Sequence, residues 1–198
     1  MDVDLTDEVS YCGAQVVDKK LVILFNKDNL SSNAADAFGR QALTKALNDA
    51  PSEGLSYLAR KSVEDYNKGI TEVQSIINDQ FGKEIVLDPG FDAAYEKLKT
   101  AKTKDGFDEN LGSFILGYFR GLAKTLERNK VKEDDMVQEA LNEAAEFGKV
   151  SFRIVNPGEM KASYGEAIFE DGVLYLQTDT EYYGSNIEDV ADKVIDQL

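Results

Sequence analysis

The spacing of apolar residues changes twice along this chain, and that arrangement constrains the fold more than any other feature of the sequence. Apolar and polar residues alternate near the start, apolar residues recur every three to four positions between about residues 33 and 147, and alternation returns from Val150. Alternation is typical of strands and the longer period of helices. The sequence therefore predicts an α+β fold, with strands at both ends of the chain and helices between them.

The first strands are predicted to form a hairpin. Residues 11–17 alternate, and the apolar run Leu21–Phe25 follows after Asp18 and Lys19. An alternating strand beside a run that is apolar throughout is typical of an outer strand paired with a central one.

The C-terminal part predicts three more strands, in the runs Val150–Ile154, Glu166–Glu170 and Leu174–Asp179. Asp171-Gly172 between the last two runs indicates a tight hairpin, so we expect a meander. The chain then ends in a predicted helix, because Ser185 and Glu188 have capping-box spacing and an apolar stripe follows.

About five helices are expected between the two groups of strands. The segment 111–129 is apolar on all sides and therefore central, and Ser113, Gly117 and Gly121 leave a groove in it that another backbone can approach closely. In the next helix, 133–147, we expect Met136 to lie on the inner side.

A hairpin alone is marginally stable in water, so we expect the N-terminal hairpin and the C-terminal meander to join in one mainly antiparallel sheet. The whole chain, residues 1–198, is then a single α+β domain with a surface loop at 99–110. The alternative is a helical body that carries two separate small sheets.

Charge is distributed unevenly. The chain has 37 acidic and 22 basic residues and a net charge of -15; residues 1–18 carry five acids and no base, and residues 133–198 carry 16 acids and four bases. The negative electrostatic potential of such a chain repels nucleic acid and anionic membranes, so neither is an expected partner. If one sheet forms, the two acidic segments meet in a contiguous anionic surface.

Composition excludes several chemistries. The chain has no histidine and one cysteine, which removes Ser-His-Asp catalysis, histidine-ligated metals and internal disulfides. Nucleotide-binding glycine motifs are absent, and the calcium-like segment Asp179–Gly184 has Val190 where the bidentate glutamate belongs. We therefore expect no cofactor and no metal. The acidic start is unlike a signal peptide, which predicts a cytoplasmic protein.

One face of the predicted meander combines acids with apolar and aromatic side chains. This combination is typical of a protein interface, because acids steer a basic partner while the apolar centre supplies most of the affinity. An exposed strand edge would add backbone pairing with a peptide. The expected binding residues on this face are Glu166, Ile168, Glu170, Tyr175 and Asp179.

Arg120 lies within the apolar segment 111–129, where an isolated buried charge is too costly to keep. It either reaches the surface or closes a structural ion pair, or it anchors an anionic ligand as a further binding residue.

These features favour an acidic interaction protein without enzymatic activity, such as an inhibitor, an immunity-type protein, a chaperone or a scaffold, that binds a basic protein or peptide. The oligomeric state is not predicted. The alternative is a hydrolase or lyase that uses paired carboxylates and needs neither histidine nor metal. Its candidate pairs are Glu166 with Glu170, and members of the set Glu139, Glu143 and Glu146.

Overall fold

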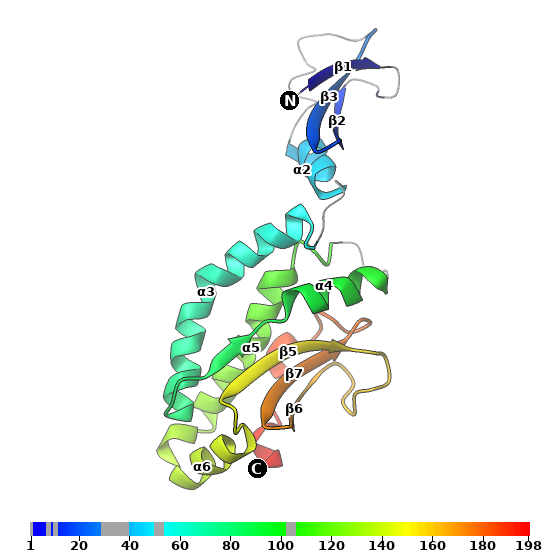
Figure 1. The fold of residues 1–198 in the computed structure, drawn as a ribbon. Helices are drawn as coiled ribbons and strands as arrows, with labels where there is room; N and C mark the ends of the chain where they lie inside the picture. The colour runs from blue at the N-terminus through cyan, green and yellow to red at the C-terminus, as the bar shows by residue number, and fades with distance from the viewer. Residues whose placement is uncertain (1, 7–8, 10–11, 29–39, 50–53, 102–105) are drawn as a thin grey trace. The chain divides into compact units, whose positions relative to one another are not determined.

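The structure is a computed structural model that describes residues 2–6, 9, 12–28, 40–49, 54–101 and 106–198 (Figure 1). It contains helices and strands, which confirms the α+β class. Contacts within the chain define two compact units, Met1–Arg60 and Lys61–Leu198, and each is described by itself. The single domain stays a prediction.

The first unit holds a three-stranded sheet and a helix. Strand β2 (Cys12–Val17) pairs antiparallel with β3 (Lys20–Asn26), which confirms the predicted hairpin. The sequence analysis did not predict β1 (Asp2–Thr6), which pairs parallel with the other edge of β3. Helix α2 (Arg40–Asp49) contacts β2, and the expected helix start at residue 33 lies outside the described residues.

The helices of the second unit follow the predicted order, and no helix in the described ranges is long and apolar enough to cross a membrane. Short 3-10 turns supplement them. The helices are α3 (Tyr57–Phe81), α4 (Phe91–Thr100), α5 (Leu111–Arg128) and α6 (Asp135–Ala144), with a 3-10 turn η1 (Val131–Glu133).

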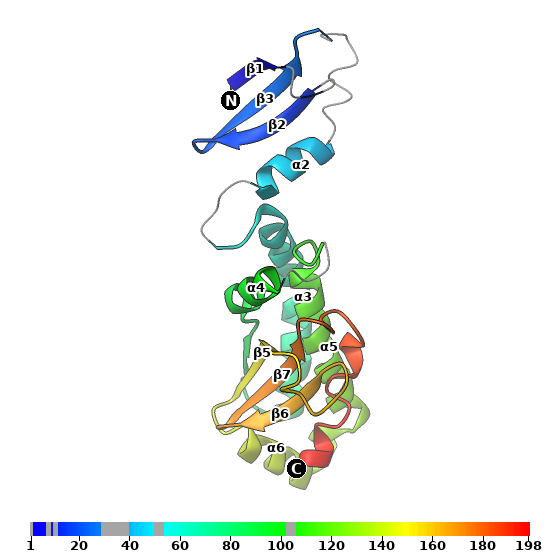
Figure 2. The same ribbon diagram turned by 90° about the vertical axis from the view of Figure 1, so that its right-hand side faces the viewer.

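The second sheet has the strand order β4-β5-β7-β6, and Figure 2 shows β7 between β5 and β6. Strand β7 lies between β5 and β6, parallel to β5 and antiparallel to β6. The predicted meander is therefore wrong, and so is the single, mainly antiparallel sheet, because the chain forms two separate mixed sheets. The strands are β4 (Val86–Asp88), β5 (Lys149–Val155), β6 (Glu166–Glu170) and β7 (Val173–Asp179).

Burial explains why β7 is central. Six of its seven residues are buried, whereas β6 has only Ala167 buried. A strand that is buried along almost its whole length is typically paired with another strand on each side, as β7 is with β5 and β6. The ten residues 156–165 between β5 and β6 are long enough for β6 to lie beyond β7. The hairpin turn itself is as predicted, with Asp171 and Gly172 at φ 49° and 73°, the left-handed conformation of a tight primed turn.

Helix α5 covers one face of this sheet (Figure 2). The ring of Tyr118 contacts that of Phe152 in β5 at a centroid distance of 4.7 Å, and both side chains are almost fully buried. The small residues of α5 admit close neighbours, as predicted. A Cβ atom at Gly121 would lie 2.6 Å from the carbonyl oxygen of Glu188, and one at Gly117 would lie 2.8 Å from the side chain of Ile187.

The C-terminal segment is not the predicted α-helix. It consists of two 3-10 turns, η2 (Ile187–Asp189) and η3 (Ile195–Gln197), and Asn186 before them has φ 47°. The apolar residues Val190, Ala191 and Val194 are buried as the stripe requires. Successive 3-10 turns bury these three residues as well as an α-helix would, and the close contact of η2 with α5 favours the turns.

Met136 is 79% exposed, so its expected inner position is wrong. The rotation of α6 is set by side chains that reach the end of α3. Gln138 donates from Nε2 to the carbonyl oxygen of Gln80, and Asn142 donates from Nδ2 to that of Phe81. These bonds turn Leu141 inward and Met136 outward, a choice that apolar spacing within the helix cannot make.

Candidate functional site

The second sheet brings four of the expected binding residues onto one face. Ile168 lies directly opposite Tyr175, and Glu166 lies opposite Gln177, which in turn lies opposite Arg153. Glu170 follows on the same side of β6, because side chains alternate along a strand. Most of this face was therefore predictable from the alternation of residues along the strands, whereas Arg153 was not predicted.

Arg153 organises the polar side chains there. Its Nη1 atom lies 2.6 Å from Oε2 of Glu170, its Nε donates to Oε1 of Gln177 at 2.8 Å, and its guanidinium carbon lies 4.0 Å from the ring centroid of Tyr175. Gln177 then donates from Nε2 to Oε1 of Glu166 at 2.8 Å. The two glutamates are therefore partnered within the sheet and do not form an open acidic patch.

A second ion pair has the same effect near β4. Lys149 Nζ lies 2.7 Å from Oδ2 of Asp88, and this oxygen also accepts a hydrogen bond from Ser151 Oγ, while Oδ1 accepts one from the N–H of Gly90. Burial opposes ionisation of Asp88, but these bonds outweigh it and lower the pKa of the carboxyl. Partly exposed pairs of this kind contribute about 0–1 kcal/mol each, so they balance charge more than they stabilise the fold.

Asp179 does not belong to an exposed face. Its side chain is 3% exposed, and its Oδ1 atom accepts hydrogen bonds from the N–H groups of Glu181 and Tyr182, each at 2.9 Å. A carboxylate in this position closes the turn that follows β7. The expected outward placement of Asp179 is wrong because its carboxylate bonds the backbone N–H groups of the turn that follows β7.

Arg120 lies apart from this face, on an exposed position of α5. Its Nη2 atom lies 3.0 Å from where a Cβ of Gly69 would be, so the guanidinium group passes over the backbone of α3. Of the expected roles, the structure supports the one in which the side chain reaches the surface.

We expect Arg120→Met to change the free energy of unfolding by less than about 0.5 kcal/mol, because an exposed position without a buried partner tolerates substitution. Thermal unfolding of the variant and the native chain measures this. A loss of about 3 kcal/mol would instead reveal a compensated buried acid.

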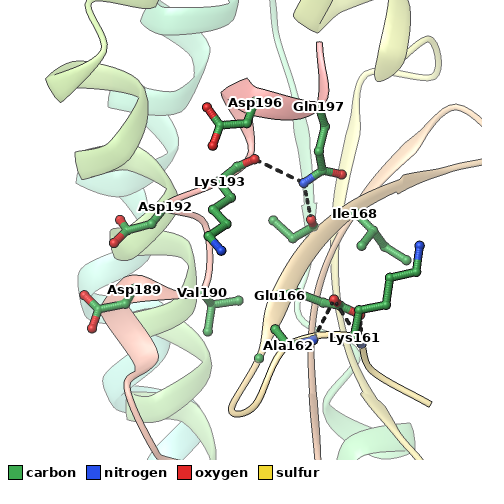
Figure 3. Close-up of a pocket in the computed structure, with 12 residues that line it drawn as sticks. Lys161, Ala162, Glu166, Ile168, Asp189, Val190, Asp192, Lys193, Asp196 and Gln197 are labelled. Atoms are coloured by element: carbon green, nitrogen blue, oxygen red, sulfur yellow. Dashed lines mark hydrogen bonds between the residues drawn. The ribbon is translucent and has the colours of Figure 1, made fainter. Parts of the chain in front are cut away.

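A groove of about 580 Å³ lies beside the outer edge of β6 (Figure 3). One side is β6 with the residues before it, and the other is the C-terminal segment around η2 and η3. At one end Gly165 packs against Val190, and a Cβ there would lie 2.7 Å from the valine side chain. The lining residues are Lys161, Ala162, Gly165, Glu166, Ala167, Ile168, Asp189, Val190, Asp192, Lys193, Asp196 and Gln197.

The strand edge in this groove carries backbone groups that point away from β7. Gln197 donates from Nε2 to the carbonyl oxygen of Ala167 at 2.7 Å, which shows the direction of that carbonyl. The backbone N–H and C=O of one residue in an antiparallel strand point the same way, and the pattern repeats at Phe169. The chain thus already offers one side-chain amide to this edge, and the groove has the chemistry to pair with an extended peptide.

Three aspartates form the opposite wall. Asp192 is paired with Arg128, whose Nη2 lies 2.7 Å from Oδ1. Asp189 and Asp196 are exposed, and no ion pair joins either of them to another described residue. In Figure 3 the side chains of the three aspartates point away from Glu166. The same wall also carries Lys193. No three acids in the described ranges are grouped closely enough to hold a metal ion.

The titration of the described carboxyl groups bears on the carboxylate-enzyme hypothesis. A catalytic acid at neutral pH needs a raised pKa. Hydrogen bonds and nearby cations instead lower the pKa of Asp65, Asp88 and Glu159, the described carboxyl groups whose pKa departs clearly from the ordinary value. The hydrolase alternative gains no support from this geometry.

Comparison with known proteins finds no matching family, no matching curated protein and no matching solved structure.

Proposed function

We propose that this chain is an acidic interaction protein that binds a basic protein partner and takes an extended, lysine-rich or arginine-rich segment of it in the groove beside β6. The observation that carries the proposal is the groove itself, which lies along the outward edge of β6 and whose acidic lining residues outnumber its two lysines: Glu166, Asp189, Asp192 and Asp196 against Lys161 and Lys193.

Each wall has a distinct contribution. Backbone pairing along β6, in which the peptide replaces the Gln197 amide at the Ala167 carbonyl, supplies affinity without regard to sequence, and the apolar lining residues Ile168 and Val190 accept alternate side chains of the bound segment. The aspartates favour a cationic segment and raise its rate of association. The net charge of -15 acts in the same direction at longer range.

A peptide-binding experiment tests this proposal. The probe is a ten-residue peptide of alternating lysine and valine with one tryptophan, and because the chain contains no tryptophan, the emission comes from the probe alone. We expect saturable binding that weakens by about tenfold or more between ~50 and ~500 mM NaCl, since salt screens exposed charges.

Two matched variants locate the site. Asp189→Asn with Asp196→Asn is expected to weaken binding by about tenfold at low salt, because it removes two carboxylates from the groove. Glu64→Gln with Glu72→Gln changes the net charge equally on exposed positions of α3 and is the control. Equal binding by both double variants, or affinity that does not depend on salt, would overturn the proposal.

A further inference from the structure

The outer side of α6 and the turn after it form a second surface, which we call the α6 surface and define by Met136, Glu139, Glu143, Glu146 and Phe147. All five side chains are exposed, and the two large apolar ones strongly so, with exposed fractions of 79% for Met136 and 68% for Phe147. Large apolar side chains this exposed, with carboxylates around them, make the surface a candidate for an interaction site.

The charge around these apolar side chains has one sign. Residues 133–147 contain six acids and no lysine or arginine. Within the part of the chain that the structure describes, no ion pair is formed by Glu139, Glu143 or Glu146. Glu170 differs in this respect, because it is paired with Arg153 on the second sheet.

Phe147 is held by contacts with the β6–β7 turn. Its N–H donates to the carbonyl oxygen of Gly172 at 3.0 Å, and a Cβ added to Gly172 would lie 3.1 Å from the phenylalanine ring. The ring therefore rests on the β6–β7 turn, and Asp171 in that turn is also exposed. A fixed aromatic ring between carboxylates is a pre-organised anchor, which loses little freedom when a partner covers it.

We propose that the α6 surface binds an amphipathic helix with a basic polar face, presented by the basic partner. The inference rests on the proposed function for the class of partner and adds a separate surface and a separate conformation. Met136 lies in the first turn of α6, and Phe147 lies in the turn that follows the helix end at Ala144, so the two apolar side chains belong to opposite ends of this element.

Complementarity of charge and shape selects this occupant. The apolar stripe of such a helix covers Met136 and Phe147, and its lysines or arginines flank the stripe within reach of Glu139, Glu143 and Glu146. Anionic membranes and nucleic acid, the other common partners of exposed helical surfaces, are repelled by carboxylates that have no compensating cation.

The test uses the full chain and a 14-residue peptide of leucines and lysines with helical amphipathic spacing and one tryptophan. We expect saturable binding with a blue shift of tryptophan emission, and weaker binding by at least about tenfold for a peptide of the same composition in scrambled order. Equal affinity for both peptides would show that charge alone acts and would overturn the inference.

Variants separate this surface from the groove. Met136→Ser and, independently, Phe147→Ser are each expected to weaken binding of the amphipathic peptide by about tenfold while leaving the lysine–valine peptide unaffected. Asp189→Asn with Asp196→Asn is expected to do the reverse. The Met136→Ser variant is expected to fold like the native chain, because the Met136 side chain is the more exposed of the two. A loss of peptide binding by this variant therefore reports on the surface and not on folding. If both serine variants bind the amphipathic peptide as tightly as the native chain does, the inference is overturned. If the native chain binds the amphipathic peptide but not the lysine–valine peptide, the proposed function is overturned and the inference is not.

Discussion

Replacing Gly112 by alanine is expected to lower the free energy of unfolding by about 3 kcal/mol. Helix α5 meets α3 at this position so closely that a Cβ would lie 2.1 Å from the carbonyl oxygen of Ser62, a backbone atom that cannot move without shifting α3. Overpacking against backbone costs about 1–3 kcal/mol and sometimes more. Chemical denaturation of both proteins measures the difference.

The same contact makes the sign of this effect diagnostic. A glycine in a free helix gains about 0.5–1 kcal/mol on replacement by alanine, so the opposite result has to come from packing. Ser62 Oγ in α3 also accepts a hydrogen bond from the N–H of Gly112 at 2.9 Å. This bond provides a partner for one of the N–H groups in the first turn of α5, which have none within their own helix. Ser113→Ala, on the exposed side of the same turn, is the control and is expected to change stability by less than about 0.5 kcal/mol. Higher stability of Gly112→Ala would refute the close contact.

Asn142→Asp is expected to destabilise the protein by about 3 kcal/mol at pH 7. The Nδ2 group of Asn142 donates to the carbonyl oxygens of Phe81 and Gln138, each at 2.9 Å, and its Oδ1 atom is buried without a hydrogen-bond partner. A carboxylate in its place loses both donated bonds and directs negative charge at the C-terminal end of α3. A partly buried charge without compensation costs several kcal/mol.

The pH dependence of this variant has a defined sign. Burial and the facing carbonyl groups raise the folded-state pKa of the new carboxyl above its unfolded value near 3.9, because they disfavour the charged form. The deficit relative to the native protein therefore grows as pH rises from about 4 toward that raised pKa, and it is smallest in acid. Asn67→Asp on an exposed position of α3 is the matched control. Equal effects of the two substitutions at pH 7 would contradict the role assigned to Asn142.

The candidate sites were predictable only in part. Glu166, Ile168, Glu170 and Tyr175 share a face because alternation along a strand is a local property. Arg153 was detectable in principle, since it is the basic residue in the middle of the predicted strand 150–154. What no pattern reveals is that Arg153 reaches Glu170 and Gln177 and so neutralises one of the two glutamates of the face, because those contacts depend on which strands are neighbours.

The α6 surface shows the same limit for a helix. The absence of basic residues from 133 to 147 is plain in the sequence, but the side on which Met136 lies depends on bonds from Gln138 and Asn142 to the end of α3. Spacing within one helix allows more than one apolar side to face inward. The surface proposed to bind a partner was therefore hidden until the two helices were placed together.

By itself, the sequence determined the α+β class and the order of most elements, though not β1 or the C-terminal turns, because periodicity, turn residues such as Asp171-Gly172 and the small residues of α5 act over a few positions of chain. Only the tertiary structure decided that the strands form two mixed sheets, that β7 lies between β5 and β6, and that the chain ends in 3-10 turns. The physical reason is that strand pairing and the rotation of a helix are chosen by contacts between residues distant in the chain, and local preferences leave several such arrangements nearly equal in free energy.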